Sequence, residues 1–123
     1  MSIRKEDDAR IVATLVFSSA FEGGPGLAHG GYVAAAFDEL LGLTQSLTGD
    51  AGMTGRLKVR YRSPCPLNTE LRMEGTVHKR EGRNIVARGS MHVGDRLVAD
   101  GEATFVVLQG EVYREKTSRF GEE

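Results

Sequence analysis

The chain has 123 residues, a formal net charge of −1 and one cysteine. This length predicts one domain, spanning residues 1–123, that is large enough to bury a core. The near balance of charge argues against nucleic acid or membranes as partners, and the lone Cys65 excludes an internal disulfide. The lone cysteine also leads us to expect a cytoplasmic protein. We find no apolar run of about 18 residues and no signal peptide.

The first half of the chain predicts one strand, a loop and one long helix. Residues 1–10 are rich in charge, so we expect a helix start or a loose end there. The β-branched run at 11–17 predicts a strand, and the glycines and proline of 18–28 are typical of a loop. Apolar side chains then recur every three or four residues, which predicts a helix over 30–47 that Gly49 ends as a C-terminal cap.

From residue 52 onward the hydrophobic pattern changes to alternation, which is typical of β-strands. Pro64 and Pro66 interrupt it, and polar turns at 80–83 and 94–95 separate the later segments. The four predicted strands lie near 57–61, 71–78, 85–93 and 97–108. We expect loose order from residue 110 onward.

Together these elements predict an α+β fold in which a five-stranded, mainly antiparallel sheet wraps around one long central helix. Only one helix is available to cover the apolar face of the sheet, so a two-layer arrangement is the economical solution. The other face and the edge strands stay uncovered, which favours a homodimer.

Asp38 is the candidate reactive carboxylate of the helix. It lies on a face of small residues, opposite the apolar positions, and next to Phe37 and Leu41. These neighbours predict a partly desolvated side chain, and a desolvated carboxylate beside a cavity is a candidate general base or nucleophile. The alternative interpretation is a surface acid or a structural hydrogen-bond partner.

The start of this helix resembles the PaaI-type acyl-CoA thioesterases, which have the hotdog fold. The likeness rests on the glycine-rich stretch 21–26, the motif His29-Gly30-Gly31 and the acid nine positions after His29. It implies hydrolysis of acyl-CoA with Asp38 as general base or nucleophile. It also implies an oxyanion hole at the Gly30 amide, with Gly31 as a second donor, and no cofactor beyond the coenzyme A of the substrate.

Two further positions bear on this resemblance. Thr54 lies where some family members have a Ser or Thr that helps to position water. Several members have an Asn six residues before the motif histidine, and Gly23 stands at that position here. We therefore expect the polar details of the site to differ from those members.

The spacing of the helix residues predicts a site shared between two chains. Gly31 and Asp38 are seven residues apart and share a helix face, but seven residues rise about 10.5 Å. One thioester carbon can hardly contact both groups of the same helix. Two antiparallel helices about a two-fold axis would bring them together, as the resemblance also implies, in a homodimer or a dimer of dimers.

The other polar residues suggest a cap and a phosphate contact rather than a metal site. His29 is interpreted first as a helix cap or loop hydrogen-bond partner, and second as a proton-transfer group. No cluster of His, Cys and acids has the spacing of metal ligands, so no metal site is predicted. The tip of a basic hairpin is predicted to contact the phosphates of coenzyme A through Lys79, Arg80, Arg83 and Asn84. A solvated charged surface is the alternative.

Two functional hypotheses remain. The first is an acyl-CoA thioesterase, and the second is a non-catalytic acyl-CoA-binding module on the same fold, because fold alone does not determine function. The presence of Asp38 together with the glycine amides favours catalysis. The preferred acyl group stays open at this point, as does the choice between a dimer and a dimer of dimers.

Overall fold

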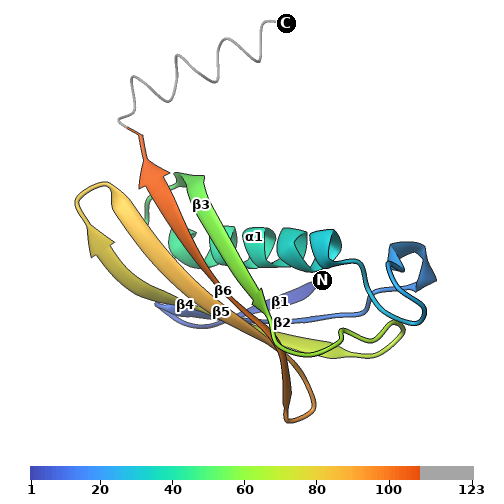
Figure 1. Ribbon diagram of the computed structural model, residues 1–123. Coiled ribbons are helices and arrows are strands. Elements are labelled where there is room, and N and C mark those ends of the chain that lie inside the picture. Colours follow the sequence, from blue (N-terminus) through green and yellow to red (C-terminus); the bar gives the residue numbers. More distant parts are fainter. Residues whose placement is uncertain (109–123) are drawn as a thin grey trace, which may run out of the picture.

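The computed structural model describes residues 1–108, so the loose order expected from residue 110 onward lies outside the described residues. Six strands form one antiparallel sheet in the order β1-β2-β4-β5-β6-β3, and the helix α1 crosses one face of it (Figure 1). The helix α1 is Gly30–Ser46, and a short 3-10 helix, η1, is Ser19–Phe21. The strands are β1 Ser2–Asp7, β2 Arg10–Leu15, β3 Gly52–Tyr61, β4 Leu71–Glu81, β5 Asn84–Val93 and β6 Arg96–Val107.

The predicted α+β architecture is confirmed, with one correction to the number of strands. We predicted five strands, but Ser2–Asp7 forms a sixth, β1, where a helix start or a loose end was expected. β1 pairs antiparallel with β2, from Ser2 opposite Thr14 to Asp7 opposite Arg10. The sequence did not predict this strand because every side chain of β1 is exposed. Its sequence shows no apolar alternation, and its pairing depends on backbone hydrogen bonds to β2.

A row of glycines lets α1 lie close to the sheet. Gly75, Gly89 and Gly101 are opposite one another on β4, β5 and β6. A Cβ added at Gly101 would lie 2.8 Å from the Phe37 ring, and one at Gly89 would lie 3.1 Å from the Leu41 side chain. Only residues without a side chain leave room for these helix residues. The glycine row therefore determines how closely the helix, which carries the candidate site, packs on the sheet.

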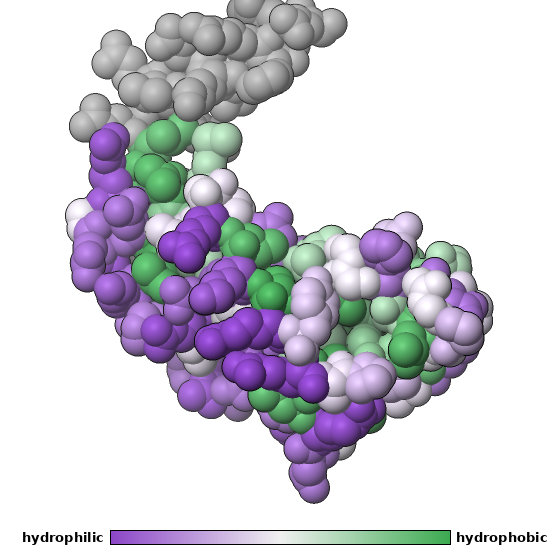
Figure 2. Space-filling view, in the orientation of Figure 1, coloured by the Kyte–Doolittle hydropathy of each residue, from purple (hydrophilic) through white to green (hydrophobic). Residues whose placement is uncertain are grey.

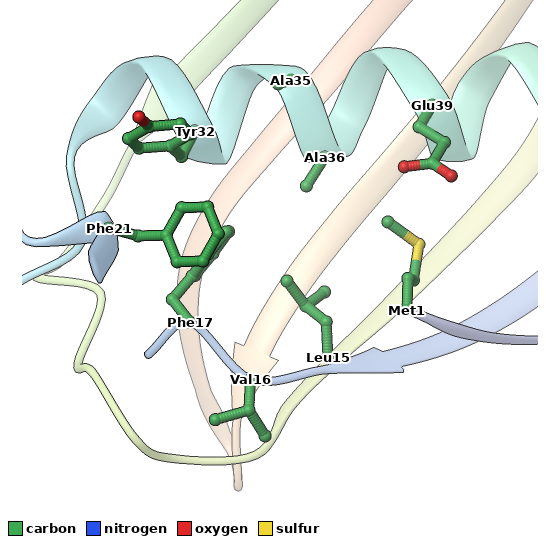
Figure 3. Close-up of a pocket in the computed structure, with 9 residues that line it drawn as sticks. All are labelled: Met1, Leu15, Val16, Phe17, Phe21, Tyr32, Ala35, Ala36 and Glu39. Atoms are coloured by element: carbon green, nitrogen blue, oxygen red, sulfur yellow. The ribbon is translucent and has the colours of Figure 1, made fainter. Parts of the chain in front are cut away.

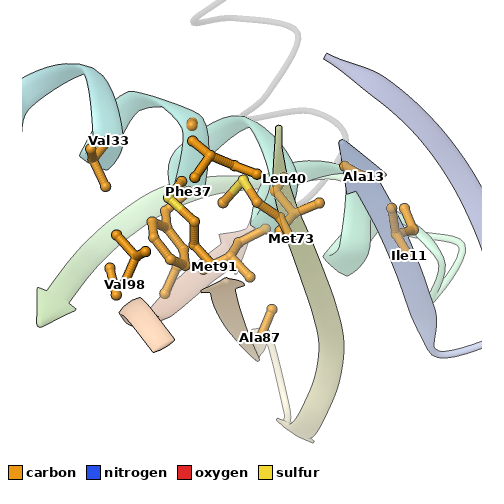
Figure 4. Packing of buried hydrophobic residues seen from close by; sticks show 14 of the residues in the cluster. Ile11, Ala13, Val33, Phe37, Leu40, Met73, Ala87, Met91 and Val98 are labelled. Atoms are coloured by element: carbon orange, nitrogen blue, oxygen red, sulfur yellow. The ribbon is translucent and has the colours of Figure 1, made fainter. Parts of the chain in front are cut away.

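The core lies between α1 and the middle strands of the sheet. Phe37, Leu40 and Leu41 are fully buried and belong to one apolar cluster with side chains from β2, β4, β5 and β6 (Figure 4). The predicted helix is confirmed to within one residue at its C-terminal end. Gly49 follows it with a φ of +91°, the left-handed conformation that favours glycine after a helix. Among the described residues, no helix is both long and apolar enough to cross a membrane.

An irregularity in β3 turns Thr54 toward the helix. The register with β6 shifts between Thr54 and Arg56, so Gly55 is an extra residue and forms a β-bulge. Leu57 and Val59 pack against the core from the helix side of the sheet. Strict alternation from these two residues would point Thr54 to the opposite face. The bulge instead places Thr54 on their face, beside α1.

Candidate active site

The N-terminus of α1 is capped by the residue that precedes it. His29 is the N-cap, and its Nδ1 accepts a hydrogen bond of 2.9 Å from the Gly31 N–H. The interpretation of His29 as a helix cap is therefore confirmed. The bond satisfies one of the backbone donors that a helix leaves unpaired at its start.

Tyr61 holds the same peptide unit from its other end. The Tyr61 hydroxyl donates a hydrogen bond of 2.7 Å to the Gly30 carbonyl oxygen, and this carbonyl belongs to the peptide that carries the Gly31 N–H. His29 and Tyr61 together therefore orient the Gly30–Gly31 peptide. The sequence did not reveal this role, because Tyr61 is 31 positions from Gly30 and has only the pattern of an ordinary strand residue.

These contacts distinguish the two predicted oxyanion donors. The Gly31 N–H is engaged by His29, whereas the Gly30 N–H has no acceptor among the described residues. Gly30 is the first residue of α1, so its N–H lies at the positive end of the helix dipole. The geometry favours Gly30 over Gly31 as the group that donates to an oxyanion.

Asp38 is hydrogen-bonded to the threonine that the β3 bulge turns toward it. The Thr54 hydroxyl donates to Asp38 Oδ1 over 2.9 Å, although the two residues are 16 positions apart. The expected desolvation of Asp38 is wrong for the single chain, because its side chain is exposed. Gly31 and Ala35, on the same small-residue face of α1, are also exposed within residues 1–108.

The predicted site residues of the single chain therefore fall into two separate groups, which we call half-sites. The amide half-site consists of His29, Gly30 and Tyr61, and the carboxylate half-site consists of Asp38 and Thr54. Gly30 and Asp38 are eight residues apart on one helix, which corresponds to a rise of about 12 Å. This separation is too long for both groups of one chain to contact the same thioester carbon.

The loop before α1 has no room for a side chain at Gly23. A Cβ there would lie 2.8 Å from the Cα of His29. The loop is closed by the Gly23 N–H, which donates to the Leu27 carbonyl oxygen, and by the His29 N–H, which donates to the Phe21 carbonyl oxygen, both over 2.8 Å. The asparagine that several PaaI-type thioesterases have at this position would require a different loop backbone.

The basic hairpin tip lies at the same end of the sheet as Thr54. Asn84 is opposite Val106 on β6, and Val106 is opposite Met53 on β3. Two strand spacings, about 10 Å, therefore separate the tip from the residue next to Thr54. The tip and the carboxylate half-site are therefore neighbours at this end of the sheet.

Two of the three cations at this tip already have acidic neighbours. Lys79 pairs with Glu81 at 3.1 Å, and Arg80 pairs with Asp50. Arg83 makes no ion pair in the part of the chain that the structure describes. Lys79, Arg80 and Arg83 are exposed, so these cations are open to solvent and to exchange with a phosphate.

The basic outer face of β3 is partly neutralised by its neighbour β6. Asp100 pairs with Arg60 at 3.0 Å and with Arg62 at 2.7 Å. Burial raises the pKa of the Asp100 carboxyl, but the hydrogen bonds and charges of the two arginines outweigh it and hold the pKa below its ordinary value. Figure 2 shows the hydrophilic side chains gathered over this face. Two of its arginines are thus engaged within the sheet.

Cys65 is poorly suited to act as a nucleophile. Cys65 is buried, and burial raises the pKa of its thiol more than the nearby Arg96 lowers it. A thiol with a raised pKa is a poor nucleophile at neutral pH. Within residues 1–108, no group of three or more His, Cys, Asp or Glu side chains is placed to hold a metal ion.

Comparison with known proteins identifies the family. A model of the thioesterase superfamily matches residues 25–99, from the glycine-rich loop to β6. This chain belongs to the thioesterase superfamily. Its relatives include the acyl-coenzyme A thioesterase THEM4 of Bos taurus, which is 32% identical over 106 residues, 86% of this chain and 44% of that protein. The chain spans less than half the length of the curated relatives that it matches.

Solved structures place this superfamily member in the hotdog fold. A crystal structure of a thioesterase superfamily protein is 31% identical, with a TM-score of 0.81 over 85% of this chain and 54% of that one. A hypothetical thioesterase of Streptococcus pneumoniae TIGR4, solved with coenzyme A, is 24% identical, with a TM-score of 0.81 over 86% of both chains. This second likeness shows the fold alone. Two mutant structures of a hypothetical thioesterase from that organism carry an Asp-to-Ala and a Thr-to-Ala replacement.

Proposed function

We propose that this chain hydrolyses acyl-CoA thioesters to a carboxylic acid and free coenzyme A. The observation that carries the proposal is the hydrogen bond from Thr54 to Asp38, which orients a carboxylate on a helix whose first N–H has no acceptor among residues 1–108. Membership of the thioesterase superfamily and the name of the relative THEM4 support this class of reaction.

The two half-sites supply the chemistry of thioester hydrolysis. Asp38 takes a proton from water, and the water oxygen bonds to the carbonyl carbon. The Gly30 N–H donates to the carbonyl oxygen as it becomes negative, and one such donor is typically worth about 3 kcal/mol of barrier. The C–S bond then breaks, and coenzyme A leaves as a thiolate that takes up the proton. Alternatively, Asp38 attacks the carbonyl carbon itself, and water hydrolyses the resulting anhydride.

The Thr54 hydroxyl selects which oxygen of the carboxylate reacts. It donates to Asp38 Oδ1, so Oδ2 remains open to water or to the thioester. The aspartate and the threonine replaced in the two streptococcal mutant structures have the same separation along their chain as Asp38 and Thr54 have here. This agreement supports the carboxylate half-site as a functional pair.

We further propose that the half-sites meet across a homodimer, which is also the unit of a dimer of dimers. Two antiparallel α1 helices about a two-fold axis would place the Gly30 N–H of one chain beside Asp38 of the other. The exposed residues Gly31 and Ala35 give this helix face a profile low enough for close approach. In addition, β3 is an edge strand of the sheet, and its unpaired backbone groups are available to a second copy.

Mixed dimers test the shared site. Gly30→Pro removes the N–H, and the helix should form as before, because proline is well accepted at the first helical position and His29 already has the extended backbone that precedes a proline. Neither Gly30→Pro nor Asp38→Asn homodimers should turn over acyl-CoA. Refolding the two variants together in equal amounts should restore about a quarter of the parental rate, since half of the dimers have one intact site.

The mass of the parent by light scattering, at micromolar concentration, is the accompanying measurement. A mass of one chain would overturn the dimer. If both sites lay within single chains, the mixed dimers would contain only damaged sites, and no restoration of activity would be observed.

We propose that the hairpin tip holds the phosphates of coenzyme A. Replacing Lys79, Arg80 and Arg83 with alanine should raise KM for an acyl-CoA several-fold and leave kcat nearly unchanged, because only contacts to the nucleotide are lost. The KM for the matching acyl-pantetheine, which lacks the nucleotide, should not change. Lys58→Ala on the outer face of β3 is the matched control. Equal losses on both substrates would reject this phosphate contact.

The second candidate function is an acyl-CoA-binding module without catalysis. A panel of acyl-CoAs, from acetyl through aromatic to long-chain, separates the two functions when free thiol release and binding are measured on the same protein. Release of thiol that is abolished by Asp38→Asn supports the thioesterase. If the protein binds acyl-CoAs but releases thiol from no member of the panel, the thioesterase is rejected and the acyl-CoA-binding module is supported.

A further inference from the structure

A groove of about 300 Å³ runs between α1 and the segment that follows β2 (Figure 3). It is lined mostly by apolar side chains, among them Leu15, Phe17, Phe21 and Ala36. Ligand pockets in proteins start at about this volume and have this kind of lining. The groove uses no residue of the carboxylate half-site, so the reaction proposed above does not explain it.

One end of the groove adjoins the amide half-site. Tyr32 lines the groove and packs edge to face against Phe21, with ring centroids 4.8 Å apart. Tyr32 also packs against the His29 ring, with centroids 5.9 Å apart. His29 is the residue that directly precedes Gly30. A thioester whose carbonyl oxygen accepts a hydrogen bond from the Gly30 N–H can therefore place its acyl group in the aromatic end of the groove.

A single carboxylate stands at the other end. Glu39 lines the groove seven residues after Tyr32 on the same helix, about 10 Å farther along. Figure 3 shows its side chain directed from α1 toward Met1 across the groove. Glu39 makes no ion pair and accepts no hydrogen bond from any side chain within residues 1–108. It is thus an exposed hydrogen-bond acceptor at the end of an apolar groove.

We propose that this groove receives the acyl group of the thioester, and that Glu39 selects acyl groups with a hydroxyl at their far end. This inference rests on the proposed thioesterase function. A plain alkyl end would remove water from the carboxylate without replacing its hydrogen bonds, which is unfavourable. A terminal hydroxyl donates to the carboxylate in place of that water, and hydrogen bonds to charged groups are the stronger ones. The substrate class is therefore a medium-length ω-hydroxyacyl-CoA.

The test compares octanoyl-CoA with 8-hydroxyoctanoyl-CoA. The parent should have a kcat/KM about tenfold higher for the hydroxylated substrate, because a site built to accept a hydroxyl discriminates against the analogue that lacks it. Glu39→Leu should reverse this preference by raising kcat/KM for octanoyl-CoA and lowering it for the hydroxylated substrate. Glu70→Leu, which replaces an exposed glutamate outside the groove, is the matched control and should keep the parental preference.

The outcomes separate this inference from the proposed function. If the parent hydrolyses neither substrate, the proposed function fails, and the dissociation constants of the S-octyl and S-(8-hydroxyoctyl) thioethers of coenzyme A still test the groove. Equal kcat/KM values for the two substrates in the parent would overturn the inference while leaving the thioesterase intact. Equal loss of both activities in Glu39→Leu would also overturn it, and would make Glu39 a catalytic acid instead.

A second groove, of about 360 Å³, lies at Leu27, Gly30 and Tyr61. It is the competing place for the acyl group. Leu27→Gln should leave the preference between octanoyl-CoA and 8-hydroxyoctanoyl-CoA unchanged. A change of preference in Leu27→Gln, together with none in Glu39→Leu, would place the acyl group in this second groove and overturn the proposal.

Discussion

Replacing Asp38 with asparagine is expected to lower kcat for acyl-CoA hydrolysis by about 10²- to 10⁴-fold. Asparagine has nearly the same shape as aspartate but cannot take a proton from water, so the loss should be in kcat while KM changes little. Thr54 can still donate to the side-chain oxygen, as it does to Asp38. The melting temperature should therefore not fall. Thiol-release kinetics and thermal melts on the purified variant measure both quantities.

The matched control for this variant is Asp95→Asn in the exposed turn between β5 and β6. It makes the same chemical change away from both half-sites and should leave kcat and KM unchanged. A folded, dimeric Asp38→Asn protein with kcat within about threefold of the parent would contradict a catalytic Asp38. Glu39, the next acid on α1, and the acyl-CoA-binding module would then have to be considered. A lower melting temperature with unchanged turnover would indicate a structural role for Asp38.

Replacing Phe37 with alanine is expected to lower the free energy of unfolding by about 3–5 kcal/mol. Phe37 is fully buried, and its ring packs on the glycine row at Gly101 and Gly89. Removing the ring leaves a cavity that the backbone of three paired strands cannot close. The loss is a large share of the 5–15 kcal/mol, roughly, that stabilises a typical domain. Urea denaturation of parent and variant, at equal protein concentration, measures it.

Two further variants distinguish a cavity from a general loss of apolar surface. Leu43→Ala removes an apolar side chain that is 38% exposed on the same helix, and should lower the free energy of unfolding by far less. Gly101→Ala should destabilise the parent, because its Cβ would lie 2.8 Å from the Phe37 ring. In the Phe37→Ala background the same methyl group should be tolerated. Additive effects of Phe37→Ala and Gly101→Ala would show that the two residues do not pack as described.

The elements with a local signal were predictable from the sequence. The apolar period of the helix predicted its span, which the structure confirms as Gly30–Ser46 with Gly49 in the left-handed turn behind it. The alternating segments and polar turns between them predicted the hairpins of β4 with β5 and of β5 with β6. β1 was not predictable in this way, because a fully exposed strand has no apolar alternation.

The candidate site was predictable in its residues and not in its contacts. The motif from His29 to Gly31 and the acid at Asp38 stand out in the sequence because they surround one helix start. The contact of Tyr61 with Gly30 did not stand out, because it joins two segments 31 positions apart. The exposure of Asp38 in the single chain was also not predicted, because Phe37 and Leu41, its apolar neighbours in the sequence, are buried while Asp38 lies on an exposed face.

The helix, its cap at His29, the hairpins and the acid on a small-residue face depend on neighbouring residues, and all of them could be predicted from the sequence. Other features depend on the register between distant strands and became visible only in the folded chain. The alignment of Gly75, Gly89 and Gly101 under the helix and the bulge that turns Thr54 toward Asp38 belong to this second kind. A shift of one residue in the register of a strand moves every side chain in it to the opposite face of the sheet. Such a shift changes which groups meet while leaving the local pattern of the sequence unaltered.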